Sequence, residues 1–153
     1  MSKPQPGRYP IAVTARAPTA TRTEVQARRH RLTIDEPPSN GGQDLGPLPL
    51  EVLLASLAGC STVIANKIAA EMGIRLEALE IKVSGDLVMA VIQGRGSNPF
   101  PEIALSISGR SDASATQQGK LAEELARRCP VSVLLRAAGC RIAETWDLQP
   151  LEI

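Results

Sequence analysis

The sequence predicts a single α+β domain in which antiparallel strands surround one long, buried central helix. The stretch 47–73, PLPLEVLLASLAGCSTVIANKIAAEMG, has a proline suited to a first helical turn and ends at Gly73, which suits the left-handed position after a helix. Residues 52–64 are almost all apolar or small, so we expect this half to be buried and residues 66–71 to reach solvent. Alternating apolar and polar residues before and after this helix indicate strands.

The segment before the helix is predicted to be a loose arm over residues 1–9, followed by the single domain over residues 10–153. Residues 11–16 alternate as a short half-buried strand, and residues 21–34 as one or two further strands antiparallel to it. Residues 35–48, DEPPSNGGQDLGPL, have the composition of a loop leading into the helix. The simplest interpretation of the arginine cluster, Arg22, Arg28, Arg29 and Arg31, is a solvated face, although one arginine could reach inward.

The segment after the helix predicts a second antiparallel group and two helices. Residues 76–84 and 103–107 have the period of two, and 87–92 is an apolar run of strand length. A helix capped within 111–114 should run to about Arg128. Since the residue before a proline leaves helical geometry, Pro130 should begin a short helix that ends before Gly139, with a final strand over 140–148.

Bulk composition excludes several classes of function. The formal net charge is +1 and the aromatic residues are Tyr9, Phe100 and Trp146 alone, which leaves neither a basic field nor a stacking platform for nucleic acid. The first residues lack an apolar signal core, and the apolar run around Cys60 looks too short and too interrupted to span a bilayer. We therefore expect a cytoplasmic protein with neither nucleic-acid nor membrane partners.

Three cysteines carry the candidate chemistry. Cys60, Cys129 and Cys140 form no CxxC pair, and the single His30 provides no zinc-ligand set, so neither a disulfide framework nor a metal site is expected. Cys60 is either a buried structural thiol or a reactive one. Cys129, before Pro130, is either a simple cap or a thiol that the helix N-terminus activates, with Arg127 and Arg128 adding positive charge. We interpret Cys140 as structural and His30 as a surface or interface residue.

Four segments give these cysteines a context. They are DEP at 35–37, GGQDLGPLPLEVLLASLAGC at 41–60, FPEIALSI at 100–107 and RCPVSVLL at 128–135. In order and spacing they resemble the OsmC/Ohr family of osmotically inducible and organic hydroperoxide resistance proteins. The resemblance implies an OsmC-like fold, an intertwined homodimer with two active sites at its interface, and a peroxidase without metal or organic cofactor. It further implies that Cys60 attacks an organic hydroperoxide, that Cys129 resolves the sulfenic acid, and that a dithiol, lipoyl-type or small, supplies the electrons.

This chemistry sets requirements that the sequence can be tested against. Burial raises a thiol pKa, so a cation or polar group must favour the Cys60 thiolate. A disulfide between Cys60 and Cys129 requires α carbons roughly 4.4 to 6.8 Å apart, at once or after a local movement. Where the family's peroxidase branch has its glutamate, this chain has Leu50. Glu51 lies nine positions before Cys60, near the opposite side of the helix, and we expect it to bind first-turn amides.

The activating arginine is not identified by the pattern. The family's arginine should lie in the turn after the first strand, where this chain has Thr19, with Arg16 and Arg22 three positions to either side. Two other functions therefore stay open beside the peroxidase. One is a non-catalytic module that binds a small apolar or acyl ligand, and the other is a redox sensor whose Cys60–Cys129 disulfide changes its shape or partners.

Overall fold

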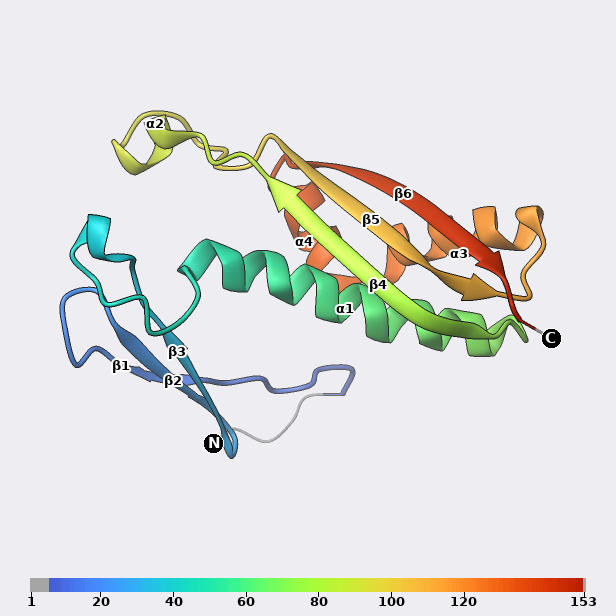
Figure 1. Cartoon of the computed structure of the whole chain (residues 1–153), viewed down its shortest axis with the longest axis horizontal. Helices are drawn as coiled ribbons and strands as arrows, with labels where there is room; N and C mark the ends of the chain where they lie inside the picture. The colour runs from blue at the N-terminus through green and yellow to red at the C-terminus, as the bar shows by residue number, and fades with distance from the viewer. Residues whose placement is uncertain (1–5, 153) are drawn as a thin grey trace. The chain divides into compact units, whose positions relative to one another are not determined.

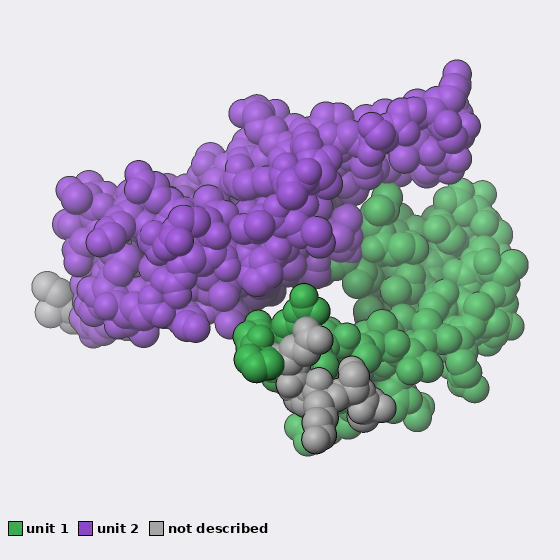
Figure 2. Space-filling view, turned by 180° about the vertical axis from the view of Figure 1, so that it is seen from behind, with its two compact units in different colours: residues 1–52 green, residues 53–153 purple. Residues whose placement is uncertain are grey.

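The computed structural model describes residues 6–152, and the chain divides into two compact units, residues 1–52 and 53–153 (Figure 1, Figure 2). Residues 1–5 of the predicted arm lie outside the described residues. The assignment of residues 10–153 to one domain stays a prediction. Each unit contains one three-stranded sheet, so the α+β class is confirmed.

The first unit is a meander of β1 (Thr14–Arg16), β2 (Thr23–Ala27) and β3 (His30–Ile34), with every pair antiparallel. Two strands within 21–34 are thereby confirmed. The predicted half-burial of 11–16 is wrong: β1 has three residues and all are exposed. On one face of this sheet Ala15 is exposed and its cross-strand neighbour Val25 is half-buried.

The loop 35–48 is organised around one buried carboxylate. Asp35 is 1% exposed and accepts hydrogen bonds from the backbone amides of Glu36, Gln43 and Leu45 at 2.9, 3.2 and 3.3 Å. Between them lies the 3-10 helix η1 (Pro38–Asn40). Close backbone packing requires glycine in this loop, because a Cβ at Gly42 would lie 1.8 Å from the carbonyl oxygen of Glu36.

The predicted central helix is α1 (Pro49–Glu71), and Gly73 follows it with φ of +68° as expected. Its burial differs from the prediction. The buried residues form a single stripe, Leu57, Ser61, Ala65, Ile68 and Ala69, which lies largely in the second half of the helix. Val63, which lies in the apolar stretch 52–64 that was predicted to be buried, is 66% exposed. One chain covers only one side of a helix that is apolar nearly all round.

By length and composition α1 is also a helix that could cross a membrane, contrary to the expectation that this run is too short and interrupted. It passes because the whole helix has 23 residues, whereas the apolar run around Cys60 is shorter. The core helix of a globular fold passes the same test. Within the single chain, 28% of the 18-residue apolar window on α1 is buried.

The second unit contains β4 (Leu76–Gly85), β5 (Glu102–Ser111) and β6 (Arg141–Pro150) in that spatial order (Figure 1). β4 and β5 are antiparallel as predicted, but β5 and β6 are parallel. The helices between β5 and β6 form a crossover, which returns the chain to the same end of the sheet. Residues 87–92 were predicted as a strand and instead contain the helix α2 (Met89–Ile92). This apolar run follows the end of β4 at Gly85, where strand pairing with β5 stops.

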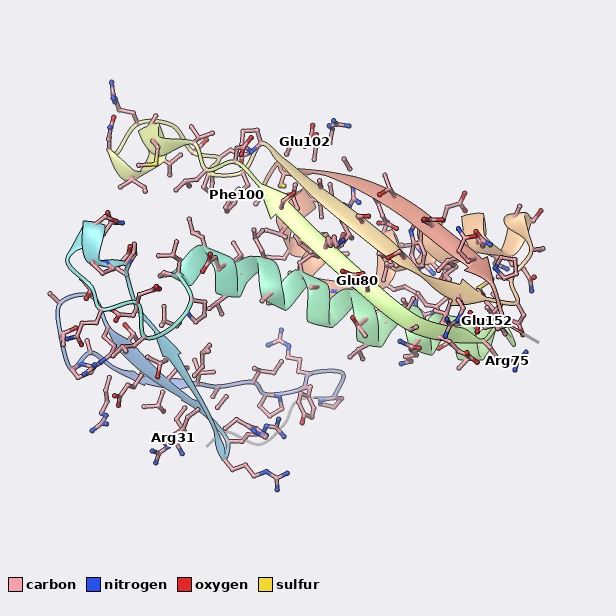
Figure 3. All side chains as sticks on the ribbon, in the orientation of Figure 1. Arg31, Arg75, Glu80, Phe100, Glu102 and Glu152 are labelled. Atoms are coloured by element: carbon pink, nitrogen blue, oxygen red, sulfur yellow. The ribbon has the colours of Figure 1, made fainter. Side chains whose placement is uncertain are left out.

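The crossover consists of α3 (Ala115–Arg128) and α4 (Pro130–Ala137), close to the predicted limits. Ser114 and Gln117 form a reciprocal capping box at the start of α3. Ile103, Leu105, Ile107, Leu121 and Leu125, each at most 1% exposed, form the core between the sheet and these helices. Phe100, labelled in Figure 3, is buried just before β5, where the α2 excursion rejoins the sheet.

Candidate functional site

The structure brings Cys60 and Cys129 into direct contact. Cys60 lies on α1 and is partly exposed, whereas Cys129, between α3 and α4, is 0% exposed. The Cys129 thiol is near enough to Cys60 to influence the charge state of the Cys60 thiol. Ser61, the residue after Cys60, places its hydroxyl oxygen 3.9 Å from the Cys129 sulfur. Because Cys129 precedes a proline, its backbone is extended (φ −72°, ψ 111°), and α4 starts in a new direction there.

Two opposing influences act on the Cys60 thiol. Burial raises the pKa of Cys60 above its ordinary value, and the neighbouring Cys129 raises it further. The backbone N–H of Val131 lowers the pKa of Cys60 and so opposes both, because a donor beside the sulfur favours the thiolate. Val131 is the second residue of α4. The N-terminus of α4, which could have activated Cys129, therefore acts on Cys60 through the Val131 amide. The Cys129 side chain makes no capping hydrogen bond.

The expected positive charge beside Cys129 is cancelled by carboxylates. Arg127 pairs with Glu124 at 2.7 Å within α3. Arg128 pairs with Glu71 at the end of α1, through Nη1 at 2.6 Å and Nη2 at 3.0 Å. Both guanidinium groups are held by partners other than the thiol.

Glu51 was predicted to bind amides of the first turn, and it binds the amide just before that turn instead. Its carboxylate accepts a hydrogen bond at 2.8 Å from the backbone amide of Leu48, one residue before the first turn of α1. Thr19 occupies the position expected for the family's arginine. Its hydroxyl oxygen accepts hydrogen bonds from the backbone amides of Thr21 and Arg22 and stabilises a turn.

The two arginines beside that turn differ in their partners. Arg16 pairs with Glu24 at 2.9 Å and its side chain is 80% exposed. Arg22 makes one long side-chain hydrogen bond, 3.4 Å to Gln43, and its buried Nε has no partner among the described residues. Arg31, labelled in Figure 3, is exposed as the solvated-face interpretation expects.

The remaining candidates take no part in this arrangement. Cys140 is 6% exposed at the start of β6, where burial raises its pKa, and its thiol donates to the carbonyl of Arg141 at 3.7 Å. His30 is exposed at the first position of β3. Within residues 6–152 no group of three potential ligands could hold a metal ion. Sequence reasoning missed Ser61 and the Val131 amide. The sequence signal for Ser61 was a hydroxyl within an apolar helix, and the signal for Val131 was its place directly after Cys129-Pro130, at the start of a helix.

The comparison with protein families agrees with this geometry. A family model described as OsmC-like protein matches residues 41–145, a range that includes both contacting cysteines. The chain belongs to the OsmC-like family. No curated protein sequence matches it.

Solved OsmC-like structures share the fold over nearly the whole chain. An OsmC-like protein from Mycoplasma pneumoniae is 24% identical, with a TM-score of 0.79 over 92% of this chain and 98% of that one. An organic hydroperoxide resistance protein OsmC from Legionella pneumophila is 17% identical, with a TM-score of 0.69 over 91% and 97%. The organic hydroperoxide resistance protein OhrB of Bacillus subtilis is 20% identical, with a TM-score of 0.62 over 92% and 98%. These TM-scores establish the OsmC-like fold of this chain.

Proposed function

We propose that this OsmC-like protein is a thiol peroxidase that reduces organic hydroperoxides, with Cys60 as the attacking thiol and Cys129 as the resolving thiol. The observation that carries the proposal is that these two thiols are neighbours, one partly exposed and one buried, with the hydroxyl of Ser61, the residue after Cys60, 3.9 Å from the Cys129 sulfur. Two solved structures of the same fold bear the name organic hydroperoxide resistance protein. Ile64, one turn after Cys60 on α1, is apolar and half-buried, which suits an organic substrate.

The proposed cycle has three balanced steps. The Cys60 thiolate attacks one peroxide oxygen, the O–O bond breaks, and the alkoxide leaves with a proton as an alcohol, so that Cys60 becomes a sulfenic acid. The Cys129 thiol then attacks the Cys60 sulfur and loses its proton, and the sulfenic hydroxyl leaves as water. An external dithiol reduces the resulting disulfide and becomes a disulfide itself.

The first step needs a thiolate, and among the described residues the Val131 amide lowers the pKa of Cys60 whereas burial and Cys129 raise it. We propose that an arginine favours the thiolate and that Arg22 is a better candidate than Arg16. Arg22 has a buried Nε without a partner among the described residues, whereas Arg16 is salt-bridged and exposed. Arg22→Ala should raise the pKa of Cys60 and slow peroxide reduction at least about tenfold, while Arg16→Ala should leave both near wild type. The check is the pH dependence of Cys60 alkylation in each variant.

The proposal includes a homodimer and a cytoplasmic location without nucleic-acid or membrane partners. Apolar side chains are exposed on both helices that flank the thiols, with Val63 on α1 at 66% and Leu134 on α4 at 68%. A second copy would cover them. A dithiol, lipoyl-type or small, is the reductant in this scheme.

The deciding experiment counts thiols before and after one equivalent of cumene hydroperoxide and maps any disulfide by peptide mass. The proposal expects a Cys60–Cys129 disulfide, catalytic turnover with dihydrolipoamide or dithiothreitol, and loss of turnover in Cys60→Ser. Thiols inert to stoichiometric peroxide, with a small ligand co-purifying, would instead establish a binding module. Stoichiometric oxidation without turnover would establish a redox sensor. Either result overturns the peroxidase.

A further inference from the structure

The residue immediately before Cys129 is tied to the helix that carries Cys60. The guanidinium of Arg128 binds both carboxylate oxygens of Glu71 in a fork, at 2.6 and 3.0 Å. It also approaches Glu124, one turn earlier on α3, at 3.6 Å. We propose that Arg128 and Glu71 are positioning residues that hold the Cys129 thiol against the Cys60 thiol. This inference rests on the proposed function only in its consequence for peroxide turnover.

The geometry of α1 supports this role. Glu71 lies eleven residues after Cys60, and at about 100° per residue the two lie within roughly 20° of the same side of the helix. Arg128 and Cys129 are consecutive. The ion pair and the thiol pair are therefore two attachments on one side of α1, about 16 Å apart along its axis, to consecutive residues at the junction of α3 with α4.

Within its own helix Glu71 has a favourable neighbour in Lys67, one turn earlier, but its place at the helix end is unfavourable. It is the last residue of α1, where the carbonyl ends make the helix terminus negative and disfavour a carboxylate. Arg128, in contrast, lies in the last turn of α3, where a cation is favoured. The hydrogen bond from Arg128 lowers the pKa of Glu71 and keeps the carboxylate charged. The pairing with Arg128 thus accounts for an acid at an otherwise unfavourable position.

The fork is suited to positioning because it fixes direction as well as distance. A bidentate arginine–carboxylate pair restricts the orientation of both groups, which a single contact does not. The Arg128 and Glu71 side chains are 27% and 48% exposed, so the pair should contribute little to overall stability. Its effect should be on the distance between two sulfurs, where small displacements change rates strongly.

The test measures how strongly the two thiols favour each other, without peroxide. Wild-type protein and variants are equilibrated with reduced and oxidised glutathione, and the fraction of mapped Cys60–Cys129 disulfide gives their effective concentration. Arg128→Ala and Glu71→Gln should each lower this value roughly three- to tenfold. The double variant should fall no further than either single variant, because both remove the same contact.

Arg127→Ala is the matched control. It removes an ion pair from the neighbouring arginine, but one that stays within α3. Its effective concentration should remain within about twofold of wild type. Thermal unfolding of each variant separates a loss of fold from a loss of positioning, and Glu71→Gln, which keeps the shape of the side chain, covers the case in which Arg128→Ala does not fold.

The outcomes distinguish this inference from the proposed function. Equal effective concentrations in wild type, Arg128→Ala and Glu71→Gln would overturn the positioning role, and so would an equal fall in Arg127→Ala. A large fall in the first two variants in a protein that proves inert to cumene hydroperoxide would support positioning and overturn the peroxidase. In an active enzyme, Arg128→Ala should also accumulate sulfinic acid at Cys60, because resolution is slower.

Discussion

At the scale of single residues, function and stability both depend on where buried polar groups find partners. Cys60 lies between the Cys129 thiol and the Val131 amide, so its charge state depends on a backbone donor as well as on burial. Asp35 shows the opposite balance. Burial raises its pKa, but the amides of Glu36, Leu45 and Gln43 and the Thr21 hydroxyl together hold the pKa of Asp35 below its ordinary value.

This balance makes the stability of the 35–48 loop dependent on pH. A carboxyl whose pKa is lowered on folding stabilises the fold above its unfolded pKa of about 3.9 and loses that contribution as the pH falls through the folded value. In Asp35→Asn one side-chain oxygen still accepts hydrogen bonds, but the new NH2 group faces backbone N–H donors, so the variant should have a lower melting temperature. The difference in melting temperature between wild type and variant should be constant from about pH 7 to 5 and shrink below about pH 4. Circular-dichroism melts across this range provide the check; a gap of constant size down to pH 2 would contradict the assignment.

At the scale of elements, local signals explain most of what the sequence predicts correctly. Proline, glycine and capping residues mark the ends of α1, α3 and α4 to within two residues. The misassigned elements are those that depend on distant partners. An apolar run becomes a strand only beside another strand, and residues 87–92 have none. The direction of β6 relative to β5 is set by the crossover helices, which the alternation within each strand does not reveal.

Two glycines give a matched test at this scale. Gly42→Ala would place a Cβ 1.8 Å from a backbone oxygen, whereas a Cβ at Gly59 on α1 meets nothing within 4 Å. Gly42→Ala should therefore cost more than about 2 kcal/mol of unfolding free energy, and Gly59→Ala should gain up to about 1 kcal/mol from helix propensity. Urea unfolding of both variants measures the difference. Equal unfolding free energies would show that the 35–48 loop can relax around the added methyl group.

At the scale of the whole molecule, the candidate site could be predicted only in part. The pair of Cys60 with Cys129 follows from the family resemblance, and the structure brings the two thiols together. The fork between Arg128 and Glu71 could not be predicted, because no local pattern links residues 57 positions apart. The apolar stretch 52–64 of α1 was predicted to be buried, but one side of it is exposed in the single chain. Hydrophobicity predicts that a surface is covered and does not say which chain covers it.

That exposed side leads to a prediction about assembly. Val63→Glu and Leu134→Glu place charges on the apolar surfaces of α1 and α4 that we propose are covered by a second copy. Each should change sedimentation from twice the 16.2 kDa chain mass toward a single chain. Ile92→Glu on α2, a side chain that is 65% exposed, is the control and should leave assembly unchanged. Wild-type protein that sediments as a single chain would refute the proposed dimer.

The unequal exposure of the two sulfurs determines the order of events in the reductive half of the proposed cycle. Cys129 is 0% exposed, whereas Cys60 is partly open to solvent. An incoming reductant therefore reaches the Cys60 sulfur, and Cys129 departs as the leaving thiolate. The mixed disulfide between protein and reductant forms on Cys60, so the same sulfur receives first the oxidant and then the reductant.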